Sequence, residues 1–346
     1  MRIAQVLTAS TGGIGRHVAS LVPRLVQRGH RIRVFCPPVS ATTHQLAQSG
    51  TEVLPLADLV RGVRGADVVH AHGYKAGALA WPAARLARAP LVVSWHNAVL
   101  ADHPALGPAR LLQRLVARAA DHTLGASEDL VAEAQRLGAR RARLLPVAAP
   151  SVPVARMSRD ATRTALGVRP EQVLVLTVAR LAPQKNLGLV LDVAAALRDR
   201  GDLRFAVAGE GPERAALTER IAAQRLPVTL LGHRDDLGSL LSAADLALLT
   251  STWEARALVA QEALLSGLPL VSTAVGGVPG LVGDAAILVD FGDSAAAAEA
   301  VRALADDPAE RARRATAGRR QAATWPTEDD VVNDLLTAYA DLAQRR

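Results

Sequence analysis

Two carboxylates eight residues apart are the strongest chemical signal in this sequence. Glu254 and Glu262 lie in the stretch STWEARALVAQEALLSGLPLVST, residues 251–273. Glu262 falls within an apolar run, where an ionised carboxylate is costly unless it finds partners. If residues 254–262 are helical, the rise between the two is about 12 Å, roughly the reach from ribose to sugar in a nucleotide-sugar. The alternative is a surface glutamate at a helix start and one core glutamate with satisfied hydrogen bonds.

Two cations precede this pair in the same half of the chain. Arg180 ends an apolar run, and Lys185 follows five residues later. The chain has 40 Lys and Arg residues, yet only Lys75 and Lys185 are lysines. Arg can bind a phosphate bidentately, whereas Lys acts as a compact point charge. The spacing predicts a diphosphate clamp in a loop, and the alternative is a pair of solvated loop charges.

The first half of the chain carries weaker signals. Gly12, Gly13 and Gly15 follow an apolar run and open a helical pattern, a setting in which backbone N–H groups can face a phosphate. Val18 stands where the full dinucleotide-binding motif has glycine, so a plain tight turn is the alternative. His96 ends another apolar run, where histidine suits orienting or proton-handling roles, and the alternative is a hydrogen-bonded strand-end residue.

Two further features have ordinary explanations. His70 and His72 share one face of a predicted strand, but no Cys, Asp or Glu ligand is visible nearby, so we expect packing or surface roles and no metal site. The helical pattern at 109–120 has arginines on one face, and it predicts an amphipathic helix over a sheet, with a membrane-surface helix as the alternative. The residues are Arg110, Arg114 and Arg118, with Leu111, Leu112, Leu115 and Val116 assigned to the opposite face.

Short apolar runs and helical patterns alternate along the whole chain and position these residues. The alternation predicts an α/β fold with two doubly wound parallel sheets, joined by the proline-containing stretch 143–157. We expect a first domain at residues 1–150, a second at 151–326, and a last helix at 327–346 that packs back on the first. Such sheets bind ligands at the carboxyl ends of their strands, so we expect the two domains to share a cleft.

Composition limits the partners. Residues 1–150 hold 18 basic and 8 acidic residues, a net charge of +10, whereas residues 151–346 hold 22 and 25, a net charge of −3. The basic half suggests an anionic partner, such as a membrane surface, a phosphorylated acceptor or nucleic acid, and the alternative is an arginine-rich composition without a specific partner. Aromatic residues make up only 3%, which disfavours nucleic-acid binding by base stacking.

The remaining composition points to a cytoplasmic location. Cys36 is the only cysteine, which excludes an intramolecular disulfide and a cysteine-based zinc site. No apolar run reaches 18 residues, and the start lacks a signal-peptide pattern. We therefore expect a cytoplasmic protein, with peripheral contact to the inner face of an anionic membrane through the basic half.

Several of these segments together resemble the family-4 retaining glycosyltransferases, which have the GT-B fold of two facing Rossmann-like domains. The resemblance covers nearly the whole chain, and the segments occur in the family's order. They are TGGIGRHV (11–18), SWHN (94–97), VARLAPQKNL (178–187), VAGEGPE (207–213), EALLSGLPLVST (262–273), GGVPG (276–280) and AILVDFGD (286–293).

The resemblance implies a retaining transfer of a sugar from a nucleotide-diphosphate sugar bound by the second domain to an acceptor bound by the first, without metal or cofactor. Arg180 and Lys185 would hold the diphosphate, Glu262 the ribose, and Glu254 would lie by the transferred sugar. His96 would contact that sugar. The other implied donor-binding residues are Gly12, Gly13, Gly209, Arg234, Arg256, Ala257 and Leu258.

The chain also departs from the family. Arg256 and Ala257 stand where the family has an aromatic residue and glycine, so Arg256 either enters the sugar pocket or points to solvent. Gly280 replaces a frequent glutamate. The base, the sugar and the acceptor stay open. Alternatives are a GT-B-like nucleotide-sugar epimerase, a phosphorylase with lysine-bound pyridoxal phosphate, and a silent nucleotide-sugar-binding protein.

Overall fold

The computed structural model describes residues 1–10, 12–99, 106–148 and 154–343. Thr11 of the glycine turn and residues 149–153 of the predicted connection lie outside these ranges. The chain divides into two compact units, which we treat separately. The first comprises Met1–Ala148 with Pro326–Arg346, and the second comprises Ala149–Trp325.

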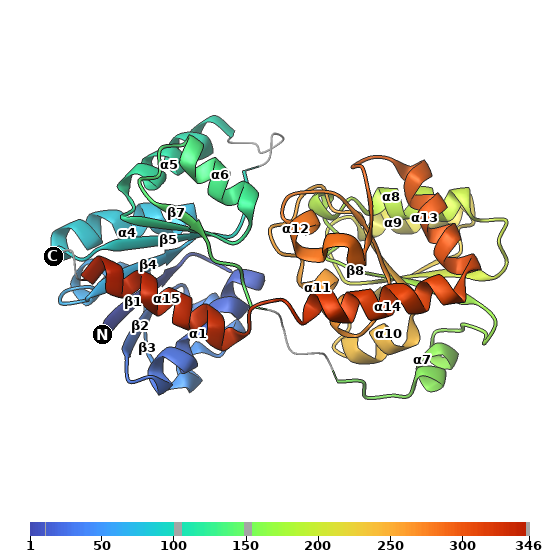
Figure 1. Cartoon of the computed structure of the whole chain (residues 1–346), viewed down its shortest axis with the longest axis horizontal. Coiled ribbons are helices and arrows are strands. Elements are labelled where there is room, and N and C mark those ends of the chain that lie inside the picture. The colour runs from blue at the N-terminus through green and yellow to red at the C-terminus, as the bar shows by residue number, and fades with distance from the viewer. Residues whose placement is uncertain (11, 100–105, 149–153, 344–346) are drawn as a thin grey trace. The chain divides into compact units, whose positions relative to one another are not determined.

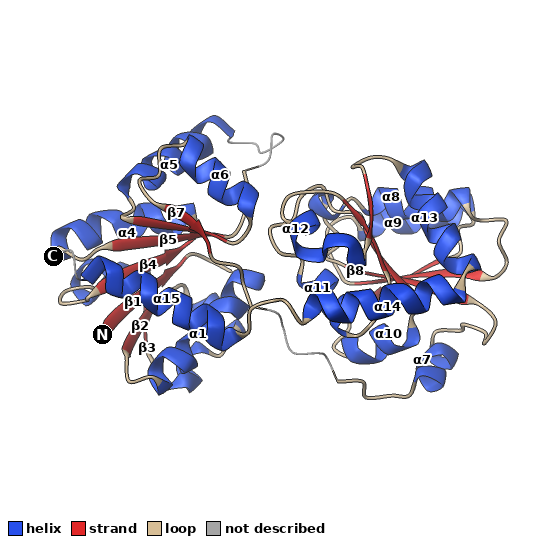
Figure 2. Cartoon of the chain, in the orientation of Figure 1, coloured by secondary structure: helices blue, strands red, loops and turns tan. Residues whose placement is uncertain are grey.

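The first unit is built on a seven-stranded parallel sheet in the order β3-β2-β1-β4-β5-β6-β7 (Figure 2). Most of its strands are apolar and buried on both faces, as a parallel sheet covered by helices requires. The strands are β1 Arg2–Leu7, β2 Arg31–Phe35, β3 Glu52–Leu54, β4 Val68–His72, β5 Leu91–Trp95, β6 His122–Gly125 and β7 Ala142–Leu144.

Helices cover both faces of this sheet. Helix α15, from the far end of the chain, lies beside α1, while α4 and α5 pack on each other (Figure 1). Arg28 pairs with Asp329 at 2.8 Å, and Val332 and Leu335 of α15 are fully buried in the core of this unit. The longer helices are α1 Gly13–Gln27, α4 Tyr74–Ala87, α5 Leu106–Ala119, α6 Glu128–Arg136 and α15 Glu328–Ala343, and the short ones are α2 Pro38–Thr43 and α3 Leu59–Gly62.

The second unit has a six-stranded parallel sheet in the order β10-β9-β8-β11-β12-β13. Its strands are β8 Val173–Val178, β9 Leu203–Ala208, β10 Val228–Gly232, β11 Leu246–Leu249, β12 Leu270–Thr273 and β13 Ile287–Val289. Its helices are α7 Arg159–Ala165, α8 Leu187–Ala196, α9 Arg214–Gln224, α10 Leu237–Ala243, α11 Leu258–Leu265, α12 Val278–Val282, α13 Ser294–Asp306 and α14 Pro308–Ala322. A one-turn 3₁₀ helix, η3, spans Pro183–Lys185, and a second, η4, spans Gly283–Ala285.

The order of chain connections reverses once in each sheet, between β1 and β4 in the first and between β8 and β11 in the second. Doubly wound sheets bind their ligands outside the carboxyl ends of the strands at such a point. The prediction of two Rossmann-like parallel sheets is therefore confirmed, and the reversals identify the edge of each sheet at which a ligand site is expected.

Three local predictions were wrong. Residues 254–257 are not helical: α11 begins at Leu258, and Ala257 caps it in an extended conformation. The connection predicted from 143 onward begins later, because β7 pairs with β6 through Leu144. Leu111 and Leu115 are 60% and 49% exposed and lie beside the arginines, since successive helical residues turn by only about 100°.

Candidate functional site

The carboxyl edge of the second sheet brings the predicted cation and carboxylate together. Lys185 ends η3 in the loop after β8, and Glu254 lies in the loop after β11. The Lys185 ammonium forms an ion pair with Glu254 Oε1, which also accepts a hydrogen bond from Ser251 Oγ at 2.7 Å. Glu254 is 9% exposed, so this is a mostly buried pair at the chain reversal of the sheet.

Hydrogen bonds between the two loops fix this pair. The Thr252 amide donates to Gln184 O at 2.8 Å, and the Gln184 side chain donates to Trp253 O at 3.0 Å. Thr250 Oγ1 donates to Lys185 O at 3.0 Å. The backbone on both sides of the pair is therefore held by bonds that do not use its charged atoms.

A third loop, the GGVPG turn after β12, supports Glu254 from behind. The Gly277 amide donates to Glu254 O at 2.8 Å. Gly276 has φ +53°, and a Cβ there would lie 2.2 Å from Glu254 O. Both its conformation and this close approach require glycine, so the turn that looked like a family signature has a packing reason.

The other cations near this edge differ in their surroundings. Arg180 is exposed at the start of the loop that carries Lys185. Arg234 makes a bidentate pair with Asp236, with Nε to Oδ1 at 2.7 Å, and this pair raises the Arg234 pKa above its usual value. Gly209 has φ +142°, and a Cβ would lie 1.9 Å from Ala179 O, so packing alone requires this glycine. Donor binding by these residues stays a prediction.

Helix α11 and the loop before it carry buried polar groups. Glu262 is 6% exposed, and Gln261 is fully buried with neither amide atom hydrogen-bonded among the described residues. The Arg256 guanidinium lies 5.8 Å from the centre of the Trp325 ring, which contradicts the solvent-facing alternative. Its Nε and Nη2 are buried and unpaired within the described chain, and burial lowers its pKa to about 10.

The carboxyl edge of the first sheet begins at the glycine turn. Gly12 is the N-cap of α1, and the Gly15 amide in the first turn of this helix donates to Ser10 Oγ at 3.1 Å. Gly12 and Gly13 are both exposed, so their predicted contact with a diphosphate is sterically open. Gly15 has a different role: a Cβ there would lie 2.0 Å from His44 Nε2, so its glycine serves packing.

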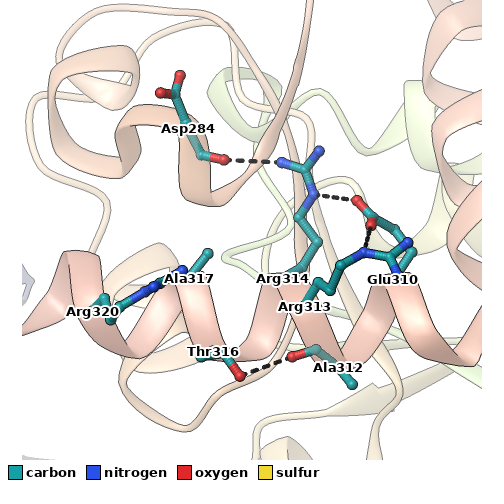
Figure 3. A pocket seen from close by; sticks show the side chains of 8 residues that line it. All are labelled: Asp284, Glu310, Ala312, Arg313, Arg314, Thr316, Ala317 and Arg320. Atoms are coloured by element: carbon teal, nitrogen blue, oxygen red, sulfur yellow. Dashed lines mark hydrogen bonds and ion pairs between the residues drawn. The ribbon is translucent and has the colours of Figure 1, made fainter.

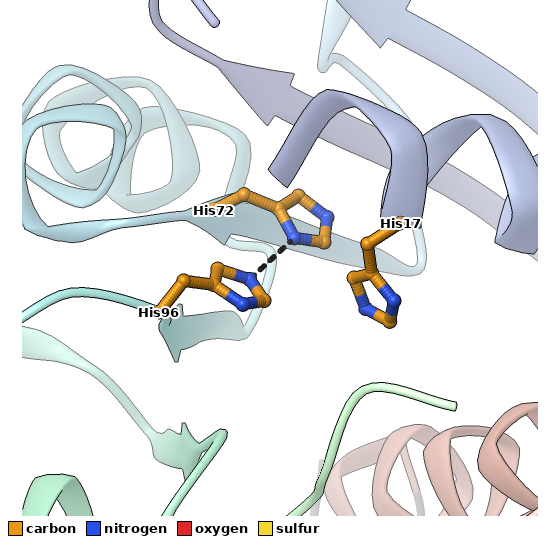
Figure 4. A group of neighbouring side chains, drawn as sticks. All are labelled: His17, His72 and His96. Atoms are coloured by element: carbon orange, nitrogen blue, oxygen red, sulfur yellow. Dashed lines mark hydrogen bonds between the residues drawn. The ribbon is translucent and has the colours of Figure 1, made fainter. Parts of the chain in front are cut away.

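His96, just after β5, belongs to a buried cluster of histidines at this edge (Figure 4). His72 Nε2 donates to Gln5 Oε1 at 2.7 Å, which leaves His72 Nδ1 to accept from His96 Nε2 at 3.3 Å. The rings of His72 and His96 stack, and His17 from α1 meets the His96 ring edge-on at 5.3 Å between centroids.

A second layer of hydrogen bonds lies below the cluster. Gln5 Nε2 donates to the Tyr339 hydroxyl at 3.2 Å, which in turn donates to His70 Nδ1 at 2.6 Å. His70 Nε2 donates to Ser94 Oγ at 2.7 Å. The expected packing role of His70 is confirmed, and Tyr339 ties the C-terminal helix to the network.

Burial keeps these imidazoles neutral near pH 7. It lowers the pKa of His17 to about 4 and that of His70 to about 3, because a charged ring loses its hydration there. The pKa values of His72 and His96 fall well below the usual range for the same reason, with repulsion from neighbouring histidines adding to it.

The sequence reasoning missed that these histidines converge. The signal was present, since one strand ends in a histidine, a second is followed by one and the first helix carries a third, but only Cys, Asp and Glu were considered as partners for His72. The adjacency of β4 and β5, with His72 opposite Ser94, is what brings His96 beside His72.

A separate surface hollow lies along α14 and η4 (Figure 3). Three of its charged residues pair with one another: Glu310 accepts from Arg313 Nε at 2.7 Å and from Arg314 Nε at 2.8 Å, and Arg314 also donates to Asp284 O. None of the predicted site residues lines it. The hollow therefore takes no part in the candidate site.

Comparisons with protein families match both halves of the chain. The model for glycosyl transferases group 1 matches residues 158–321, and the model for the glycosyl transferase 4-like domain matches residues 12–150. The chain is 31% identical to a D-inositol 3-phosphate glycosyltransferase of Geodermatophilus obscurus, over 96% of this chain and 85% of that protein. It is 27% identical to the D-inositol 3-phosphate glycosyltransferase of Streptomyces avermitilis, over 98% and 86%.

A solved structure shares the fold at low identity. It is Anabaena Alr3699/HepE in complex with UDP-glucose, with a TM-score of 0.86, 21% identity and coverage of 99% of this chain and 100% of that one. The chain belongs to the group 1 glycosyltransferases and has the GT-B fold, as the resemblance implied. Within the described residues, no helix is long and apolar enough to cross a membrane.

Proposed function

We propose that this glycosyltransferase takes its sugar from a nucleotide-diphosphate sugar bound at the carboxyl edge of the second sheet, and transfers it with retention of configuration. The Lys185–Glu254 pair carries the proposal, because it places a cation at the chain reversal of a doubly wound sheet. The complex of Anabaena Alr3699/HepE with UDP-glucose supports this donor class and makes UDP-glucose the first probe.

In this proposal the carboxyl edge of the second sheet stabilises negative charge on the leaving diphosphate. When the sugar–phosphate bond breaks, negative charge grows on the diphosphate, and a preorganised ammonium and an exposed guanidinium stabilise it. Lys185 and Arg180 fit these roles. In the free protein Glu254 neutralises Lys185, so an arriving diphosphate provides a second anionic partner for the same ammonium. The attack is on the front face, with the leaving phosphate as base and without a metal at this edge.

Glu262 is assigned to the ribose hydroxyls, and Glu254 to the transferred sugar. A carboxylate that is 6% exposed on a rigid helix holds its direction well, which suits recognition of a diol. Neither glutamate acts as the catalytic base in this proposal. His96 keeps its predicted contact with the sugar, and the hydrogen bond to His72 orients its ring.

Purified protein should be screened against UDP-, GDP-, TDP- and ADP-sugars for binding and slow donor hydrolysis. We expect hydrolysis of one donor, and the proton NMR spectrum of a transfer product should show the donor's anomeric configuration. Inverted product would contradict retention. Conversion of the donor to its epimer would favour the epimerase, and tight binding without turnover would favour a silent binding protein.

We propose further that the acceptor is anionic or lipid-linked and that the protein meets it at a membrane. Helices α4 and α5 expose large apolar side chains next to arginines, and basic amphipathic helices of this kind bind anionic interfaces. Leu86 is 74% exposed and Leu111 is 60% exposed. We call these side chains the α4–α5 surface: Leu79, Arg85, Leu86, Arg110, Leu111, Arg114, Leu115 and Arg118.

Vesicle flotation tests this surface. Wild-type protein should float with vesicles containing phosphatidylglycerol, less so at high salt, and not with phosphatidylcholine alone. The double change Leu111→Ser and Leu115→Ser should abolish flotation. Phe291→Ser is the matched control, because Phe291 is 54% exposed in the second unit. Equal flotation of all three proteins would refute the α4–α5 surface and leave the transferase proposal standing.

A further inference from the structure

We propose that His17, His72 and His96 form a binding site for one zinc-like divalent metal ion, held by three imidazole nitrogens at the carboxyl edge of the first sheet. The three rings come from α1, the end of β4 and the residue after β5, and they face a common space (Figure 4). One ligand nitrogen of each lies within 4.8 Å of the others. All three histidines belong to the first unit.

The distances between the three ligand nitrogens are close to those in a tetrahedral zinc site. Zinc–nitrogen bonds of about 2.0–2.1 Å in a tetrahedron separate ligand nitrogens by about 3.3–3.4 Å. His72 Nδ1 and His96 Nε2 are 3.3 Å apart, so one edge of the tetrahedron already exists. His17 completes the set by moving its ring inward by up to about 1.5 Å, since the ligand nitrogens lie within 4.8 Å of one another, and rotation about its side-chain bonds provides this shift.

Gln5 orients the central ligand. Metal-binding histidines almost always donate their second N–H to a carbonyl or carboxylate, which fixes the ring and its tautomer. His72 donates Nε2–H to Gln5 Oε1 at 2.7 Å, so its Nδ1 lone pair faces the other two rings. Gln5 is itself fully buried and held by the Tyr339 hydroxyl. His96 shifts its proton from Nε2 to Nδ1 to bind, and no net proton is released.

The ligand set selects the metal. Imidazole nitrogens favour zinc, cobalt and nickel ions, whereas magnesium and calcium ions prefer oxygen ligands. The three residues are 2–9% exposed and their rings are uncharged, so a metal ion does not have to displace a proton from an imidazolium to bind. Three protein ligands leave a fourth position for water or for an oxygen atom of a bound molecule, which is the arrangement of an exchangeable site.

Cobalt and zinc titrations of the full chain test the site. After treatment with EDTA and dialysis, the protein should bind about one Co²⁺ with the visible absorption of tetrahedral cobalt, and Zn²⁺ should displace it. Calorimetry should give a matching zinc stoichiometry. Absence of stoichiometric binding by the wild-type protein would overturn the proposal without any variant being made.

Variants locate the ion. His17→Gln and His72→Gln should each weaken Zn²⁺ binding by about 100-fold, and Gln5→Leu by about 10-fold, in the range that loss of an orienting partner costs. The matched control is His122→Gln, a buried histidine on β6 outside the triad, which should bind as the wild type does. Circular dichroism confirms folding of each variant. Unchanged binding in a folded His72→Gln protein would overturn the site.

His96 has a second predicted role, and the experiment separates the two. His17→Gln removes a metal ligand and leaves His96, with its hydrogen bond to His72, in place for the donor sugar. Loss of Zn²⁺ binding in this variant with donor hydrolysis retained supports a metal site that is separate from the transferase function. Failure of donor hydrolysis in every protein, with zinc binding intact, refutes the proposed function alone.

Discussion

The carboxyl edges of the two sheets lie at equivalent places in the fold but carry different kinds of side chain. The first presents neutral, buried imidazoles joined by hydrogen bonds, whereas the second presents a charged pair, Lys185–Glu254, held by backbone bonds between loops. Eight of the nine histidines lie in the first unit, and His233 alone belongs to the second. We therefore expect a change of pH to alter the stability of the first unit, and removal of a charged side chain to alter donor turnover at the second sheet.

The largest expected effect is on the charged edge. Lys185→Ala should lower donor turnover by about 100- to 1,000-fold, because an ammonium aimed at the leaving diphosphate is removed. Lys75→Ala is the matched control, since Lys75 is the only other lysine and is exposed on α4. Steady-state hydrolysis of the donor measures both. Near-normal turnover in a folded Lys185→Ala protein would refute the clamp.

Acid should destabilise the first unit selectively. Between pH 6.5 and pH 4 the unfolded chain binds a proton at His17 that the folded, metal-free protein does not, because burial lowers the folded pKa to about 4. Stability therefore falls as pH falls through this window, by about 3 kcal/mol from His17 alone. Hydrogen exchange resolved by peptide should show the loss in the first unit. Equal losses in both units would contradict the comparison.

Removing one hydroxyl should loosen the neutral network. Tyr339→Phe leaves Gln5 Nε2 and His70 Nδ1 without their partner, and should cost about 2 kcal/mol in urea unfolding. Thr337→Ala is the control, because it removes an exposed hydroxyl that bonds only to Asn333 O within the same helix. A loss in Tyr339→Phe no larger than that in Thr337→Ala would show that the network contributes little.

The smallest expected effect is a change in stability when Arg256, in the second unit, is replaced. Arg256→Phe replaces a buried guanidinium with two unpaired nitrogens by an apolar ring over Trp325, and should stabilise the protein by about 1 kcal/mol after the lost cation–π contact is counted. Arg198→Phe, at an exposed position of the same unit, is the control. Destabilisation by Arg256→Phe would mean that the Arg256 guanidinium has hydrogen-bond partners in solution.

These two edges also show what the sequence could predict. Lys185 was conspicuous because lysine is so rare in this chain, and Glu254 because it lies eight residues before Glu262, a carboxylate within an apolar run. Both signals are local, and the repeated strand–helix alternation placed them at strand ends. The doubly wound fold could be predicted from the same alternation, because strands buried on both faces occur mainly in parallel sheets covered by helices.

What could not be predicted depended on packing or on exact boundaries. The histidine cluster needs the sheet order, which places β4 beside β5 and α1 over their ends. The helix predicted from Glu254 begins at Leu258, because the loop residues are held by Gly277 and Gln184 instead of by helical bonds. Arg256 faces Trp325, which is 69 residues away in sequence, so no local pattern could reveal its direction.

The central claim is that Lys185 holds the diphosphate of the donor, and the scarcity of lysine allows a direct measurement. Protein labelled with ¹³C at lysine Cε should give two lysine signals, assigned with a Lys75→Arg variant. Titration with the donor that the screen identifies, UDP-glucose being tried first, should shift the Lys185 signal to saturation and leave the Lys75 signal in place. Donor binding seen by calorimetry with both signals unmoved would contradict the claim.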